Sequence, residues 1–224
     1  MTAVSANGEG ARCREVSPVI PPPRHACTPP GDLVVTDPEN DQRSAPAQTQ
    51  LDIVSLHVAE PAQPDRVSRL VFTLKVKDLS AFAAGNAWII LWNRPSPDAD
   101  FDRDYVAMRA TGAGTAAFKF GKVSPPSVNQ GTDLGDADSG SFSADGTIVI
   151  SVATAKVDGV TAGMDLNDLQ VRTFTANVSG QPVTQTSSDD FTALGLYTLV
   201  GNASCDPRPF AADDTATTPE GQPW

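Results

Sequence analysis

The sequence predicts an all-β protein, a β-sandwich or jelly roll of about ten short, mainly antiparallel strands. Three observations lead to this prediction. Several segments are β-rich with a period of two, clusters of Gly, Pro, Asp and Ser separate them, and no window of about twelve residues has helical periodicity.

The predicted strands follow one another along most of the chain. They lie at 51–58, 69–76, 87–92, 105–109, 147–152, 169–174 and 196–200. The segment 87–92 reads AWIILW and is apolar on both faces, which is typical of a strand buried on both sides. Asp145-Gly146 predicts a hairpin turn, because glycine tolerates the positive φ that such turns require.

Proline-rich segments at both ends suggest a single domain with two tails. Residues 1–30 include VSPVIPPPRHACTPP, the composition of a semi-rigid linker or arm. Residues 31–205 carry the strand pattern and form the predicted β-sandwich domain. Residues 206–224 are rich in proline and acid and are predicted to be a tail.

The charge of the chain excludes two classes of partner. The 224 residues carry a formal net charge of -11. Binding to nucleic acid or to anionic membrane surfaces depends mainly on Lys and Arg, so neither partner is expected. The longest purely apolar run, Ala87 to Trp92, is also far too short to cross a bilayer, and no membrane insertion is expected.

Three cysteines, Cys13, Cys27 and Cys205, bear on the compartment. Cys27 and Cys205 bracket nearly all of the patterned sequence, and we predict a disulfide between them; the alternative is three unrelated thiols. A disulfide requires an oxidising compartment, which indicates a secreted or cell-surface protein. No signal peptide is visible at the start of the chain, so we expect a fragment or the mature part of a longer protein.

Catalytic motifs are missing from the sequence, and no catalytic residue is predicted. His25 lies in the proline-rich arm, and His57 lies within a predicted strand. No GxSxG, HExxH or Walker pattern occurs. A pair of carboxylates suited to glycoside hydrolysis stays open, because any two Asp residues could face each other, but nothing singles out such a pair.

Aspartate outnumbers glutamate by 22 to 5 among the 27 acidic residues, and much of it falls in loops. Asp37, Glu39 and Asp41 lie in the loop DPEND, and Asp52 opens the next strand. Calcium takes six to eight oxygen ligands, which such a loop and strand could supply. The simpler interpretation is a turn that Asp-Pro initiates. Asp189 and Asp190 are weaker candidates, which would join this loop if the chain ends meet.

Two further acidic clusters are interpreted as loops. The segment 98–104 resembles a calcium-binding EF-hand loop in its alternation, but Arg103 occupies the position where that loop needs glycine. We therefore expect a solvated hairpin tip. Asp133, Asp136 and Asp138 in GTDLGDADSG are likewise expected in a loop.

Trp88 and Trp92 share one face of a predicted strand, because they are spaced by an even number of residues. If exposed, they would form a platform on which sugar rings stack. If buried, they belong to the core, which the apolar run AWIILW favours.

Taken in order, the segments CTPPGDLVVTDPENDQ, LDIVSLHVAEP, LVFTLKVKDLS, GDADSGSFSADGTIVISV and YTLVGNASC resemble a β-sandwich accessory domain. That domain is found at the C-terminal end of large secreted bacterial proteins, many of them subtilisin-like serine proteases. The resemblance covers about residues 27–205. It implies a non-catalytic extracellular module that follows a catalytic domain, with Asp37, Asp41 and Asp52, and less surely Glu39, at a ligand-binding corner.

Three functions therefore stand as expectations. The first is a secreted accessory module without catalytic activity, stabilised by calcium in its Asp-rich loops and attached to an upstream catalytic domain. The second is a subunit of an extracellular filament or surface assembly, joined to neighbouring subunits through its termini. The third is a carbohydrate-binding module whose partner is a polysaccharide.

Overall fold

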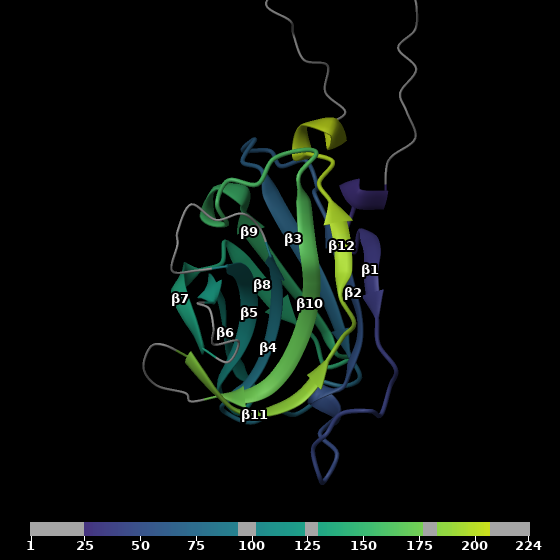
Figure 1. The fold of residues 1–224 in the computed structure, drawn as a ribbon, viewed down its shortest axis with the longest axis vertical. Coiled ribbons are helices and arrows are strands. Elements are labelled where there is room, and N and C mark those ends of the chain that lie inside the picture. The colour runs from purple at the N-terminus through teal and green to yellow at the C-terminus, as the bar shows by residue number, and fades with distance from the viewer. Residues whose placement is uncertain (1–24, 94–101, 124–129, 177–182, 207–224) are drawn as a thin grey trace, which may run out of the picture.

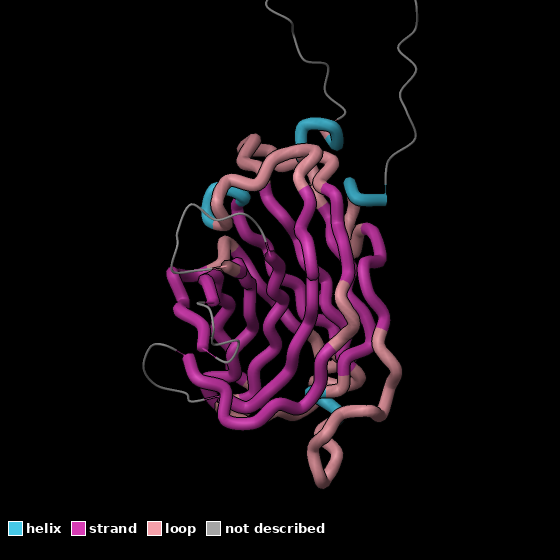
Figure 2. The backbone as a smooth tube through the Cα atoms, in the orientation of Figure 1, coloured by secondary structure: helices cyan, strands magenta, loops and turns pink. Residues whose placement is uncertain are grey.

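The computed structural model describes residues 25–93, 102–123, 130–176 and 183–206. These residues form two antiparallel β-sheets, which confirms the predicted all-β sandwich (Figure 1). Strands make up most of the fold, and short 3-10 turns lie near the ends of the strands (Figure 2). Both predicted tails fall largely outside the described residues. No helix among the described residues is long and apolar enough to cross a membrane.

The first sheet has five strands, in the spatial order β1-β2-β3-β9-β8. Each pairing within it is antiparallel. The tight connection between β8 and β9 contains Gly146 at a φ of 92°, and the amide of Gly146 donates to the Ser143 carbonyl at 3.0 Å, which confirms the predicted turn. The strands are β1 (Asp32–Thr36), β2 (Ile53–Ala59), β3 (Arg69–Val76), β8 (Ser139–Phe142) and β9 (Thr147–Ala153).

The second sheet has seven strands, in the order β11-β7-β6-β5-β4-β10-β12. It curls on itself, because β11 pairs with β7 and also with β10. Figure 1 shows β11 running along the lower end of the molecule beneath this curl. The strands are β4 (Asn86–Asn93), β5 (Arg103–Gly112), β6 (Thr115–Val123), β7 (Gln130–Asp136), β10 (Asp165–Ala176), β11 (Val183–Phe191) and β12 (Gly195–Thr198).

The curl produces a second hydrophobic cluster besides the main core. The main core lies between the two sheets and includes Trp88, Ile90 and Trp92 of β4. Ala87, Ile89 and Leu91 point from the opposite face of β4 into the second cluster, together with Tyr105, Ala107 and Phe174. Strand β4 is therefore buried on both faces, as its apolar sequence predicts.

The disulfide between Cys27 and Cys205 joins the two ends of the described chain, across a sequence separation of 178 residues. The two cysteines end the 3-10 turns η1 (His25–Cys27) and η4 (Asn202–Cys205). Ala26 is buried, and its carbonyl accepts a hydrogen bond from the amide of Glu60 at 2.6 Å. Residues 25–30, which were predicted to belong to the arm, thus begin the folded unit.

The seven strand segments predicted from periodicity all occur, with shifted ends. The sequence did not predict β1, β6, β7, β8 or β11. Strands β7 and β11 are rich in Gly, Ser, Thr and Asp, so their place in the sheet depends on backbone pairing rather than on apolar alternation. Asp133 and Asp136 consequently lie in β7 and not in a loop.

Asp104 also corrects a prediction. It lies in β5 and is buried, so it is not part of a solvated hairpin tip. Arg103 also lies in β5, Asp102 just before it is exposed, and residues 98–101 lie outside the described residues.

Candidate metal centre

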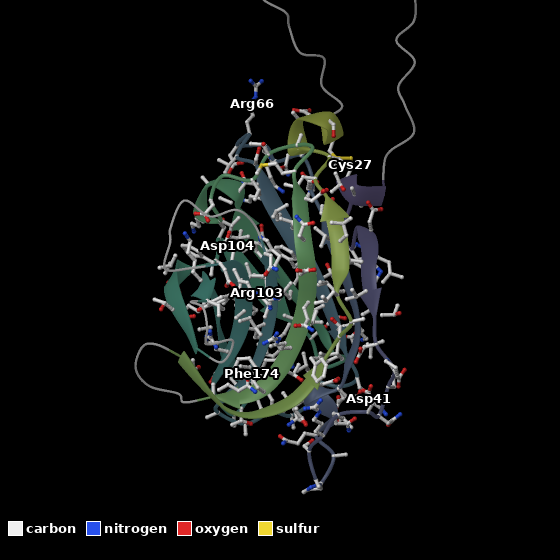
Figure 3. The ribbon with its side chains drawn as sticks, viewed as in Figure 1. Cys27, Asp41, Arg66, Arg103, Asp104 and Phe174 are labelled. Carbon is white, nitrogen blue, oxygen red and sulfur yellow. A yellow bond between two sulfur atoms is a disulfide. The ribbon has the colours of Figure 1, made fainter. Side chains whose placement is uncertain are left out.

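Three carboxylates meet at the lower end of the sandwich, at the opposite end of the molecule from Cys27 (Figure 3). Asp37 directly follows β1, Asp41 lies in the loop after it, and Asp190 lies near the end of β11. One oxygen of each carboxylate lies within 4.8 Å of the other two. Because β1 and β11 belong to different sheets, this acidic triad spans the two layers.

The loop that carries Asp37 and Asp41 is held by backbone hydrogen bonds. The amide of Asp37 donates to the carbonyl of Val54 at 2.9 Å and so continues the pairing of β1 with β2. Asn40 adopts a φ of 70°, a left-handed conformation that Asn tolerates better than most residues. Its amide donates to both carboxylate oxygens of Asp52, at 3.0 and 2.9 Å. Buried Asp52 therefore fixes the turn between Asp37 and Asp41.

Asp190 is anchored from both sheets. Its Oδ2 accepts a hydrogen bond from the amide of Ile53 in β2 at 2.8 Å. Its Oδ1 accepts one from the amide of Phe191, also at 2.8 Å. The carboxylate is almost fully buried, so these two bonds hold it beside the loop that follows β1.

Crowding of negative charge perturbs the acidic triad. Burial, together with the charges of Asp190, Asp41 and Asp52, raises the pKa of Asp37 from 3.8 to about 7. Burial also raises the pKa of Asp190 and of Asp52. The Oδ2 atom of Asp37 is buried and has no hydrogen-bond donor within the described part of the chain. A cation at this position would offset the repulsion that these groups create.

The predicted ligands fall into two groups. Asp37 and Asp41 lie in the acidic triad, and Asp190, a weaker candidate in the sequence, joins them. Glu39 is exposed, and its carboxylate lies 3.8 Å from the ammonium of Lys77.

Asp52 and Asp189 have other roles. Asp52 binds the loop backbone and lies 3.8 Å from the ammonium of Lys77. Asp189 accepts a hydrogen bond from the amide of Ser44 at 2.6 Å. Within the described residues, the groups brought together as candidate metal ligands are therefore Asp37, Asp41 and Asp190.

The residue that sequence reasoning ranked too low is Asp190. It lies 149 positions after Asp41, and the weakly patterned β11 had no strand signal. The one available sequence signal was the pair of adjacent acids in SSDDF. Only the pairing of β11 with β10 brings the second of these acids to β2.

The chemistry of the acidic triad favours a hard cation. Its donors are carboxylate oxygens, which suit calcium or magnesium rather than softer metals. Asp41 is exposed, so one side of the triad is open to solvent. Calcium takes more ligands and less regular geometry than magnesium, and its ligands commonly combine carboxylates, backbone carbonyls and water.

The tryptophan pair does not form a sugar-binding surface. Trp88 and Trp92 are fully buried, so the interpretation as a sugar platform is wrong and the interpretation as core is correct. The indole Nε1 of Trp88 donates to the Gln50 carbonyl at 2.7 Å, and Trp92 stacks on Phe72 with ring centroids 5.4 Å apart. Sheet-on-sheet packing hides both rings from any ligand.

Comparisons of the chain with protein-family models, with curated proteins and with solved structures find no match. The resemblance to accessory domains of subtilisin-like proteases therefore remains a prediction from the sequence.

Proposed function

We propose that the protein is a non-catalytic, secreted accessory module that calcium stabilises at Asp37, Asp41 and Asp190. The observation that carries the proposal is the convergence of these three carboxylates from both sheets. A cation bound there would connect the loop after β1 to β11, and would tie the two layers together at one end of the sandwich.

The disulfide supports an extracellular location. Cys27–Cys205 connects the ends of the described chain, and such bonds persist in oxidising compartments. Extracellular calcium is abundant enough to occupy sites of modest affinity. The expected place of the module is beside a catalytic domain of the same secreted protein, in line with the resemblance noted in the sequence.

The mechanism is thermodynamic linkage. A metal that binds only the folded state raises the free energy of unfolding by about 2.7 kcal/mol when its concentration is a hundred times its Kd. The crowded acids supply the reason for binding, because the cation replaces like-charge repulsion by attraction. No reaction is required of the module itself.

Thermal unfolding with calcium and with a chelator tests the proposal. We expect calcium to raise the Tm of the native chain, and magnesium to raise it less. Asp190→Asn should abolish most of the calcium effect. Glu39→Gln is the matched control, because it removes an acid from the same loop whose carboxylate lies near Lys77 and not in the triad. This variant should keep the full rise of Tm in calcium.

Two results would contradict the proposal. One is a native Tm that is the same in calcium and in chelator. The other is an equal calcium effect in Asp190→Asn and in the native chain, which would place the ion elsewhere. Loss of the effect in Glu39→Gln alone would instead favour a ligand set confined to the loop.

A further inference from the structure

A shielded ion pair lies between β6 and the connection that leads from β9 to β10. Nζ of Lys122, near the end of β6, lies 3.0 Å from Oδ1 of Asp158, which follows the 3-10 turn η3 (Thr154–Lys156). The two side chains are only 10% and 16% exposed. Shielding two charges from water costs free energy that their attraction often fails to offset. Replacement of both charges by one neutral group can therefore stabilise the fold.

A second carboxylate, that of buried Asp104, lies next to Lys122. The two residues are direct partners in the pairing of β5 with β6, so their side chains share one face of the sheet. Trp92 of β4 is the partner of Asp104 on its other side. Because Trp92 belongs to the main core, this row of three residues faces the space between the two sheets. Figure 3 shows Asp104 far from Asp41 of the acidic triad.

The backbone holds Asp158 in an apolar enclosure. Its φ of 56° is left-handed, and the amide of Gly159 donates to the carbonyl of Thr154 at 2.9 Å, which closes the turn. Val157 and Val160, close to it in the chain, belong to the main core. Oδ2 of Asp158 is buried and accepts no hydrogen bond within the described residues. The fold therefore leaves one oxygen of this carboxylate unsatisfied, at a cost in free energy.

We propose that Lys122 and Asp158 condense to form an intramolecular isopeptide bond. Nζ of Lys122 attacks the side-chain carboxyl carbon of Asp158, so an N–C bond forms and one C–O bond of the carboxyl group breaks. The three ammonium hydrogens become the amide hydrogen and the two hydrogens of one released water, which carries away the carboxyl oxygen. No oxidant, reductant or other reactant is needed. The 3.0 Å separation of Nζ and Oδ1 brings the reacting groups within attack distance.

Asp104 is placed to relay the proton. The lysine must lose a proton before it attacks, and the departing oxygen must gain one. Asp104 lies beside Lys122 on the same face, so its carboxylate is a neighbouring group that can carry this proton. The apolar surroundings assist the step, because they exclude the water that would solvate the charged pair. The reaction occurs once in each chain and does not involve calcium, so it is independent of the proposed function.

The bond would add a covalent connection between the two layers. Strand β6 belongs to the second sheet, whereas Asp158 follows β9 of the first sheet. Because a cross-link constrains the unfolded chain, it stabilises the folded state in the way that a disulfide does.

The mass of the full chain, measured after denaturation, tests the proposal. We expect it to be lower than the mass of the sequence by one water, in addition to the two hydrogens lost in the Cys27–Cys205 disulfide. Protease digestion should release a branched peptide that joins Lys122 to Asp158. A folded native chain without this loss of water would overturn the proposal, and so would a branch from Lys122 to any other residue.

Variants separate the bond from the ion pair. Lys122→Arg keeps the charge but cannot form this amide, so its mass should show no loss of water. The matched control is Lys119→Gln, because Lys119 forms an ion pair with exposed Asp136 on the neighbouring strand, and this variant should keep the loss. Asp104→Asn should slow bond formation about a hundredfold, measured as the linked fraction against time after synthesis.

Each variant also has an outcome that contradicts its premise. Loss of water in Lys122→Arg would place the cross-link elsewhere and overturn the proposal. Bond formation at the native rate in Asp104→Asn would remove Asp104 as the proton relay. If a variant does not fold, the mass of the native chain and its branched peptide still decide whether the bond exists.

Discussion

Asp37 has an environment unlike that of an ordinary surface carboxylate. It lies beside Asp41 and Asp190, and its pKa is raised to about 7. The same crowding that makes the acid weak makes the position suitable for a cation. The proposed metal ion and a proton would therefore compete for one group, and the competition is measurable.

The pH dependence of stability follows from this raised pKa. Between the unfolded value of 3.8 and the folded value of about 7, the metal-free folded state holds more protons than the unfolded state. The contribution of Asp37 to the free energy of unfolding should therefore fall as the pH rises through this window. Above about pH 7 this contribution should no longer change. Denaturant titrations in chelator at a series of pH values measure the slope.

Calcium should reverse this trend. Because calcium binds the deprotonated carboxylate, its stabilising effect should be larger at about pH 8 than at about pH 5. Asp37→Asn is the control, and it should flatten the metal-free pH dependence as well as weaken the calcium effect. A calcium effect that is independent of pH over this window would count against Asp37 as a ligand.

At the scale of the element, β4 is the strand on which both cores depend. Its even-numbered residues pack between the sheets, and its odd-numbered residues pack inside the curl. In a simple two-layer sandwich, one face of such a strand faces solvent. Here the pairing of β11 with both β7 and β10 closes the curl over that second face.

The two faces of β4 should therefore be equally intolerant of truncation. Ile89→Ala, inside the curl, and Ile90→Ala, between the sheets, should each lower the free energy of unfolding by about 2 to 5 kcal/mol. Leu33→Ala is the control, because Leu33 is 55% exposed, and it should change stability by less than about 0.5 kcal/mol. Urea unfolding measures all three. A near-neutral Ile89→Ala would mean that the second core does not contribute in solution.

Over the whole molecule, two features lie at opposite ends. Cys27–Cys205 joins the chain ends at one end, and the acidic triad lies at the other, where the proposed calcium ion would connect the sheets. Figure 3 shows Cys27 and Asp41 far apart along the long axis.

The two sheets also meet along one edge of the sandwich, where β1 and β12 lie side by side (Figure 1). Val34 and Val35 of β1 leave no room for a side chain at Gly195 of β12.

The disulfide and the proposed calcium ion should stabilise the fold independently. Replacement of both cysteines by serine should cost about 2 to 5 kcal/mol of unfolding free energy, because the disulfide constrains the unfolded chain. Distant sites without shared partners contribute additively. The calcium-induced change in stability should therefore be the same in the double serine variant as in the native chain. A smaller change would show that the two ends are coupled.

Much of the architecture could be predicted from the sequence, because it depends on local patterns. Alternation of apolar residues determined seven strands, Asp-Gly determined a hairpin turn, and the placement of Cys27 and Cys205 at the ends of the patterned region indicated their pairing. The DPEND loop was predicted as a candidate calcium-binding loop from a local pattern too, because its carboxylates are neighbours in the chain.

Only the tertiary structure decided which residues meet. Asp190 accepts from the amide of Ile53 across 137 positions, and no local signal predicts such a contact. Glu39 turned outward and Asp52 became the anchor of the loop, because Lys77 and the amide of Asn40 lie where strand pairing puts them. Trp88 and Trp92 became core because a second sheet covers them. Alternation along one strand identifies its two faces, but the elements that cover each face come from distant parts of the chain.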